Sequence, residues 1–271
     1  MGFGMSQASM KHVPLLENVR DFYALPRDPS IRFPQYRALI GTETALTHPP
    51  LMHMNPMARA HINAFIQTLL DIDIDHAASV LVPTVAQALG YSGSHLHGIG
   101  IADDVAGGWT STADIDMKRR FELHINANRT WCSTVLLASE PPTYASVIAE
   151  ITAAIVRHHW QIQHGTAVRL RDMLAQEQAV SCFVPQHAQE HTEEYEYTTQ
   201  CISAYFDETA YPAIVAVLLG DDGAASLGYP RHGFGPHAGL HYAQHPDTPI
   251  LNPAVLFYRD VATTLRDIVP Q

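Results

Sequence analysis

The longest regular pattern of apolar residues in the chain covers residues 144–164. Apolar side chains recur there every three or four positions, which is the spacing of one face of an amphipathic helix. Thr143 can cap the first turn with its hydroxyl, and Gly165 stands where glycine commonly follows a helix. The apolar positions are Tyr144, Val147, Ile148, Ile151, Ala154, Ile155 and Trp160. The pattern predicts a long helix and, after Gly165, a second helix over residues 166–177.

Short apolar runs predict the strands. Residues 99–102 and 131–138 are apolar and bounded by polar residues, as is typical of buried strands. Residues 179–184 form a similar run and are predicted as a third strand. Weaker helical patterns cover residues 55–70, 76–89, 190–206, 236–243 and 253–268. Together they predict a helix-rich α+β or α/β fold, with a small sheet of two to four strands covered by several helices.

Length and composition favour one globular domain over residues 1–271. The chain has 271 residues, of which 46% are hydrophobic, enough for a substantial core. Residues 1–50 are rich in proline and show little periodicity, so we expect them to wrap over a core formed elsewhere.

Charge and cysteine content restrict which partners the protein can bind and which cellular compartment is expected. The formal net charge is −11. Because nucleic-acid binding needs a basic face, no nucleic-acid partner is expected. There is no apolar run of about 18 residues, so no membrane span is expected. The N-terminus lacks the charged-then-apolar order of a signal peptide. The three cysteines, Cys132, Cys182 and Cys201, are too far apart for a disulfide framework or a zinc motif, which favours reduced thiols in the cytoplasm.

Carboxylates follow both of the clearer strands. Asp103 and Asp104 come directly after the first, and Glu140 comes just after the second. In α/β proteins, ligands bind outside the carboxyl ends of the strands. If the strands are parallel neighbours, these side chains gather at one edge, and His164 joins them if the chain folds back. We therefore predict Glu140, Asp103, Asp104 and His164 as catalytic residues that bind a divalent metal or carry out acid–base chemistry.

The loop after Asp104 contains a double glycine and a tryptophan. Gly107, Gly108 and Trp109 are predicted to bind substrate, with the tryptophan ring as an apolar wall. The alternative is a tight turn in which the aspartates cap backbone N–H groups.

Histidine is unusually frequent, with 17 histidines against 16 lysines and arginines. One group lies late in the long predicted helix, and a second recurs at four-residue steps, a spacing at which a helix can chelate a metal. We predict metal ligands among these residues, namely His158, His159, His164, His237 and His241. His245 continues the second group, and His95 and His97 form a weaker pair. The alternative is that most of these histidines are ordinary surface residues.

These patterns favour a cytosolic metal-dependent enzyme that acts on a small-molecule substrate. A first alternative is a non-catalytic binding or assembly protein that uses the tyrosine-rich residues 190–206 and the C-terminal helices as contact surfaces. A homo-oligomer is one such assembly. A second alternative is a haem protein in which His158, His159 or His164 is the axial ligand.

Overall fold

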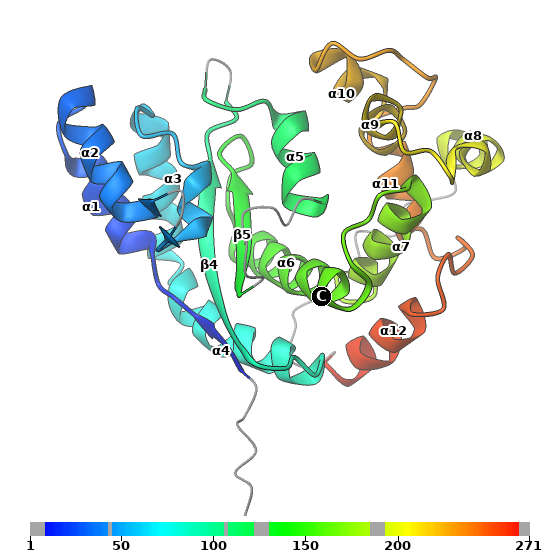
Figure 1. The fold of residues 1–271 in the computed structure, drawn as a ribbon, viewed down its shortest axis with the longest axis horizontal. Coiled ribbons are helices and arrows are strands. Elements are labelled where there is room, and N and C mark those ends of the chain that lie inside the picture. The colour runs from blue at the N-terminus through cyan, green and yellow to red at the C-terminus, as the bar shows by residue number, and fades with distance from the viewer. Residues whose placement is uncertain (1–8, 43–44, 106–107, 122–129, 185–192, 266–271) are drawn as a thin grey trace, which may run out of the picture. The chain divides into compact units, whose positions relative to one another are not determined.

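The computed structural model describes residues 9–42, 45–105, 108–121, 130–184 and 193–265. Its architecture confirms the predicted helix-rich fold with a small sheet (Figure 1). The main sheet has three parallel strands in the order β1-β4-β5. Their bounds are β1 Ser9–His12, β4 Ser94–Ala102 and β5 Trp131–Leu137, and a separate antiparallel pair joins β2 Gly41–Thr42 to β3 Ala45–Leu46.

The described chain divides into two compact units. The first contains both sheets and the start of α6 up to Ile155, and the second contains α5 from Ala113 and the part of α6 from Val156 onward. The other helices of the first unit are α1 Leu16–Ala24, α2 Pro29–Ile40, the 3-10 helix η1 Pro49–His53, α3 Ala60–Asp71 and α4 Ile74–Ala88. The expected single domain over residues 1–271 stays a prediction.

The helices of the second unit include one correction to the sequence analysis. Residues 179–184 do not form a strand, because α7 continues through them as far as Ser181. A short apolar run looks the same in a buried strand and a buried helix, so its pattern could not separate the two. The elements are α5 Thr112–Phe121, α6 Tyr144–His164, α7 Leu170–Ser181, α8 Glu193–Cys201, the 3-10 helix η2 Ile202–Tyr205, α9 Tyr211–Leu219, α10 Asp221–Ser226, α11 Ala238–Gln244 and α12 Val255–Thr264.

The N-terminal segment contributes to the core of the first unit and does more than cover it. Strand β1 pairs with β4 in parallel, with Ser9 opposite Ser94. Met10, Leu16 and Val19 are each at most 2% exposed. The strand has only four residues, three of them polar, so its sequence carries too little periodicity to predict it.

One face of the sheet lies against η1 with no room for side chains on β4. A Cβ atom on Gly98 would lie 2.9 Å from Cγ of Pro50 and 3.0 Å from Cδ1 of Leu15. A Cβ atom on Gly100 would overlap the carbonyl oxygen of Pro50. Glycine at these positions is therefore what lets η1 approach the strand closely.

On the opposite face, a chain of buried polar side chains crosses all three strands. Nδ1 of His12 lies 2.8 Å from Nδ1 of His97, and Nε2 of His97 lies 2.8 Å from Oγ1 of Thr134. At the other end, Nε2 of His12 lies 2.8 Å from Oδ1 of Asp75 in α4. Each bond is satisfied with neutral imidazoles if Thr134 donates to His97, His97 to His12, and His12 to Asp75. These bonds tie the strands to α4.

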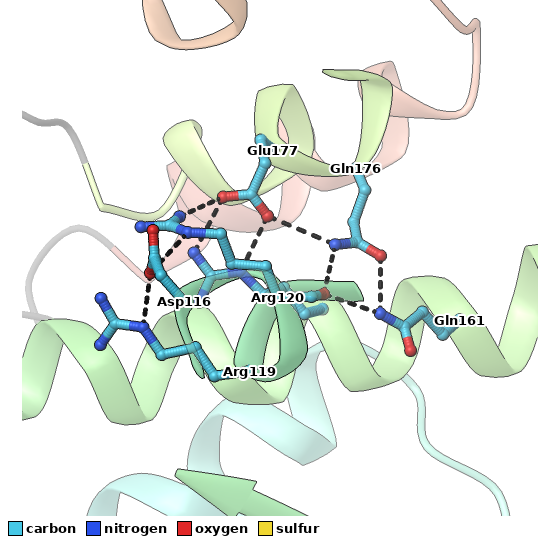
Figure 2. A network of polar contacts seen from close by, with 7 residues as sticks. Asp116, Arg119, Arg120, Gln161, Gln176 and Glu177 are labelled. Carbon is cyan, nitrogen blue, oxygen red and sulfur yellow. Dashed lines mark hydrogen bonds and ion pairs between the residues drawn. The ribbon is translucent and has the colours of Figure 1, made fainter. Parts of the chain in front are cut away.

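The second unit is joined by a buried ionic network between α5, α6 and α7 (Figure 2). Glu177 is fully buried and accepts a bidentate pair from Arg157, with its oxygens 2.8 and 2.9 Å from Nε and Nη2. Arg120 also donates to Glu177 at 2.6 Å and to Asp116 at 3.0 Å. Gln176 donates to the carbonyl oxygen of Arg120 at 2.8 Å. Both carboxylates are thus paired, which a buried charge requires.

A substitution at Gly100 tests the close approach of η1. We expect Gly100→Ala to lower the free energy of unfolding by about 1–3 kcal/mol, because the new methyl group forces η1 away from the strand. Gly98→Ala is the matched control, since its methyl group would meet only side-chain atoms, and it should cost less. Urea denaturation of the three proteins measures the difference, and equal stabilities would contradict this packing.

Removing the central carboxylate of the network tests its role in the second unit. Glu177→Ala leaves two buried arginines without their partner, so the free energy of unfolding should fall by about 3–5 kcal/mol. Asp172→Ala on the same helix breaks the half-exposed pair with Arg169 and should change it by about 1 kcal/mol or less. Urea denaturation measures the free energy of unfolding of both variants. Similar losses in the two would contradict the role of the buried ion pairs.

The same network predicts a pH dependence. Burial alone would raise the pKa of Glu177, but pairing with Arg157 and Arg120 outweighs it and lowers the pKa to about 2. Because the pKa of Glu177 is lower in the folded state than in the unfolded state, the ionised carboxylate stabilises the fold at pH values above its ordinary pKa. This contribution is lost as the pH falls toward 2. The stability difference between the wild type and Glu177→Gln should therefore shrink from pH 5 to pH 2. A difference that stays constant over this range would count against the ionic pairing.

Candidate functional site

The first unit contains a cavity of about 260 Å³ beside the carboxyl end of β4. Sites for drug-sized ligands usually measure about 300–1,000 Å³, so this one suits a small metabolite. Its position outside the end of a parallel strand is where α/β proteins commonly bind ligands. The lining residues are Arg27, Asn55, Met57, Arg59, His61, Asp103, Val105, Gly108 and Trp109.

Asp103 joins the segments that surround the cavity. It is 2% exposed and follows the last residue of β4 directly. Its Oδ1 accepts a hydrogen bond from Nε2 of His61 at 2.8 Å, and its Oδ2 accepts one from Nδ2 of Asn55 at 2.7 Å. Its carbonyl oxygen accepts from the backbone N–H groups of Trp109 and Thr110, at 3.0 and 3.1 Å. One residue therefore joins the strand end, the loop after it, a side chain from the segment between η1 and α3, and a side chain from α3.

His61 is the titratable side chain that this arrangement presents to the cavity. It lies in the first turn of α3, and its side chain is 34% exposed. Because an ionised carboxylate can only accept hydrogen bonds, Asp103 holds the proton of His61 on Nε2. The other ring nitrogen, Nδ1, is then the basic one when the imidazole is neutral. The pair therefore has a defined tautomer.

Asn55 is itself held in place on both sides. Its Oδ1 accepts from the backbone N–H of Met57 at 2.9 Å, and its carbonyl oxygen accepts from the Tyr23 hydroxyl at 2.7 Å. Burial, and secondly the negative charge of Asp103, raises the pKa of Tyr23, so the phenol keeps its proton and donates. The sequence predicted a helix over residues 55–70, but α3 begins at Ala60. The displaced helix start leaves the amide of Asn55 available to Asp103.

Two arginines bring positive charge to the same cavity. Nε of Arg27 donates to the carbonyl oxygen of Met57 at 3.0 Å, which orients the guanidinium group. Arg59 is exposed and immediately precedes α3, with no hydrogen bond from its side chain to the helix end. Both are well suited to pair with an oxyanion, because two guanidinium N–H groups match two of its oxygens.

The loop after β4 supplies the remaining wall. A Cβ atom on Gly108 would lie 2.5 Å from the carbonyl oxygen of Asp103 and 2.7 Å from its Oδ1, so a side chain there would displace the carboxylate. Trp109 is 60% exposed, which leaves its ring accessible from solvent. The structure thus brings the predicted residues Asp103, Gly108 and Trp109 into one cavity. Gly107 lies outside the described residues.

The other two predicted carboxylates do not line this cavity. Asp104 is 8% exposed and is used within the fold. Its Oδ1 accepts from the backbone N–H of Ser139 at 2.9 Å, and its Oδ2 accepts from the hydroxyls of Ser139 at 2.6 Å and Thr112 at 2.9 Å. Glu140 is exposed just after β5. Adjacent aspartates at one strand end therefore face different partners, as the alternation of side chains along an extended chain favours.

The predicted histidines of α6 lie in the second unit. His158 and His159 are 1% and 3% exposed, and Nδ1 of His159 lies 2.9 Å from the hydroxyl oxygen of Tyr258 in α12. Burial, and secondly the charge of His164, lowers the pKa of His159 to about 4, so it is neutral at physiological pH. His164 is exposed at the last residue of α6, and its ring centroid lies 4.4 Å from that of Trp160.

The histidines around α11 do not form one helical face. His237 immediately precedes the helix in a left-handed conformation with φ of 55°, and His245 immediately follows it. The ring centroids of His237 and His241 are 6.0 Å apart, while His245 stacks on Tyr195 at 3.8 Å. Over the described ranges, no group of three or more His, Cys, Asp or Glu side chains is arranged to hold a metal ion. Metal binding and haem binding stay predictions.

Sequence reasoning missed the four polar lining residues Arg27, Asn55, Arg59 and His61, and the two apolar ones, Met57 and Val105. The four polar residues lie in the N-terminal third of the chain, away from the strand ends and the histidine clusters. A single histidine early in a helix and two scattered arginines carry no motif, so only folding makes them neighbours.

In the part of the chain that the structure describes, no helix is both long enough and apolar enough to cross a lipid bilayer. No protein-family model, no curated protein and no solved structure matches this chain.

Proposed function

We propose that the chain is an enzyme that binds a small molecule in the cavity beside β4, with His61 as its general acid–base residue. The single observation that supports this proposal is the 2.8 Å contact between Nε2 of His61 and Oδ1 of the buried Asp103 at the cavity wall. A carboxylate behind an imidazole fixes the ring's orientation and tautomer and stabilises the imidazolium that forms during proton transfer.

The arrangement supports acid–base chemistry in three ways. Histidine ordinarily titrates near neutral pH, so it can both take up and release a proton there. Asn55 satisfies the second oxygen of Asp103 at 2.7 Å, so the carboxylate is kept in position by two bonds. The partial exposure of His61 leaves the imidazole accessible to a ligand. Asn55 is a positioning residue in this scheme, and His61 is the catalytic residue.

This proposal keeps the expected enzyme with a small-molecule substrate and does not depend on a metal. We place the enzyme in the cytoplasm, with support from its free cysteines Cys132, Cys182 and Cys201. Metal dependence, haem ligation, homo-oligomer formation and a non-catalytic assembly role stay predictions. Metal analysis, a visible spectrum and the oligomeric state in solution would test them.

Substitution of His61 tests the proposal. A panel of chromogenic carboxylic esters, phosphate esters and lactones would be assayed with the wild type. For any substrate that is turned over, His61→Ala should lower kcat/KM by about a hundredfold or more, because the proton-transfer group is lost. Asp103→Asn should also lower kcat/KM, because the oriented negative charge behind the ring is lost.

The control for this test is His76→Ala, which removes an exposed histidine from α4, outside the cavity lining. This variant should keep the wild-type rate. Circular dichroism of each variant would show whether the fold is retained. A wild type that is inactive on the whole panel, or a folded His61→Ala variant with unchanged kcat/KM, would contradict the proposal.

A further inference from the structure

The charges that line the cavity are unbalanced. Arg27 and Arg59 carry two positive charges, and His61 adds another when it is protonated. Asp103 is the acidic residue of this lining, and both of its oxygens are already occupied by His61 and Asn55. The two guanidinium groups therefore have no carboxylate in the lining available to pair with them.

The end of α3 adds to this imbalance. The N-terminus of a helix carries a partial positive charge, so acidic residues are favoured there and basic ones are disfavoured. The first turn of α3 contains no acidic residue, and Arg59 and His61 lie at this end instead. The charge of Arg59 at the positive end of α3 raises the electrostatic free energy, and an anion bound in the cavity would lower it.

The positive charge at the cavity contrasts with the net charge of the whole chain. The formal net charge is −11, so the general field of the protein repels anions and does not collect them. Positive charge at the cavity is thus set against the overall balance. Arg27 is also oriented by its bond from Nε to Met57, which reduces the entropy that its guanidinium group loses when it binds a ligand.

The same cavity lining contains a flat apolar surface, the indole ring of Trp109. Trp109 is 60% exposed, while the other two tryptophans, Trp131 and Trp160, are 8% and 2% exposed. An accessible indole at a cavity wall can stack on a planar ring of a ligand. Met57 contributes a second apolar side chain to the lining.

We propose that the cavity recognises small molecules that combine an oxyanion with a planar ring, with the oxyanion held by Arg27 and Arg59 and the ring against Trp109. This inference rests on the proposed function, because it names the class of substrate for the same cavity. The oxyanion is a phosphate or a carboxylate, which share the two-oxygen geometry that a guanidinium group binds.

Calorimetric titration with defined probes tests this recognition. Phenyl phosphate and benzoate each carry a ring and an oxyanion, phenol carries only the ring, and inorganic phosphate carries only the oxyanion. We expect phenyl phosphate or benzoate to bind more tightly than phenol and inorganic phosphate. The stronger of the two ring-bearing anions identifies the oxyanion. If neither binds, or if phenol binds equally well, the inference is wrong.

Two variants locate the binding. Arg27→Gln and Arg59→Gln should each weaken binding of the stronger probe by about tenfold or more, because each removes a charge-assisted hydrogen bond. Arg37→Gln is the matched control, since it removes an exposed arginine of α2 that does not line the cavity. Equal affinity in all three variants and the wild type would overturn the inference.

Fluorescence gives a second, independent readout. Probe binding should change the emission of the wild type and not that of Trp109→Phe, because the two remaining tryptophans are buried. A change that persists in Trp109→Phe would place the ring elsewhere and contradict the inference.

Two outcomes separate ligand recognition by the arginines from acid–base catalysis by His61. Tight binding of the ring-bearing anion that depends on both arginines, without turnover of any ester, supports the inference and contradicts the acid–base role of His61. Turnover of neutral esters that depends on His61, without binding of any anion, supports the acid–base role and overturns the inference.

Discussion

A single buried carboxylate, that of Asp103, fixes the geometry of the cavity. An ionised carboxylate with 2% exposure loses most of its hydration, so its oxygens need hydrogen bonds from the protein. Those bonds come from Asn55 and His61, while its backbone carbonyl holds the loop that carries Trp109. Because its two side-chain partners lie between η1 and α3 and in the first turn of α3, the carboxylate is satisfied only when both segments are in place beside the end of β4.

The second unit also contains a buried carboxylate that needs partners, and there the partners are arginines. Glu177 is fully buried between three helices and is satisfied by Arg157 and Arg120 (Figure 2). Pairs of this kind are costly to desolvate and add little net stability compared with apolar packing. Their effect is directional, because alternative packings of the helices would leave a charge unpaired. In both units, therefore, one buried acid restricts how neighbouring elements can be arranged.

The two carboxylates differ in what surrounds them, and this separates their roles. The partners of Glu177 are themselves buried, with side chains 6% and 8% exposed, so the network is shielded from ligands. The partner of Asp103, His61, is 34% exposed and lines a cavity. A titratable group that is oriented from behind and accessible from the front is the arrangement that general acid–base chemistry needs. The geometry of the second unit explains folding, and that of the first unit explains the proposed activity.

The sequence by itself determined the class of fold, the long helix over residues 144–164 and the strands before Asp103 and Glu140, because local periodicity and glycine or proline boundaries carry that information. It also indicated Asp103, Gly108 and Trp109, because residues after a parallel strand have a known place. Tertiary structure alone decided that α7 replaces a third predicted strand, that residues 9–12 join the sheet, and that Asp103 and Asp104 face different partners. It also decided that Arg27, Asn55 and His61 line one cavity with Asp103, although as many as 76 positions of the chain separate them. Such long-range contacts follow from packing and from the need to satisfy buried charge, which no local pattern records.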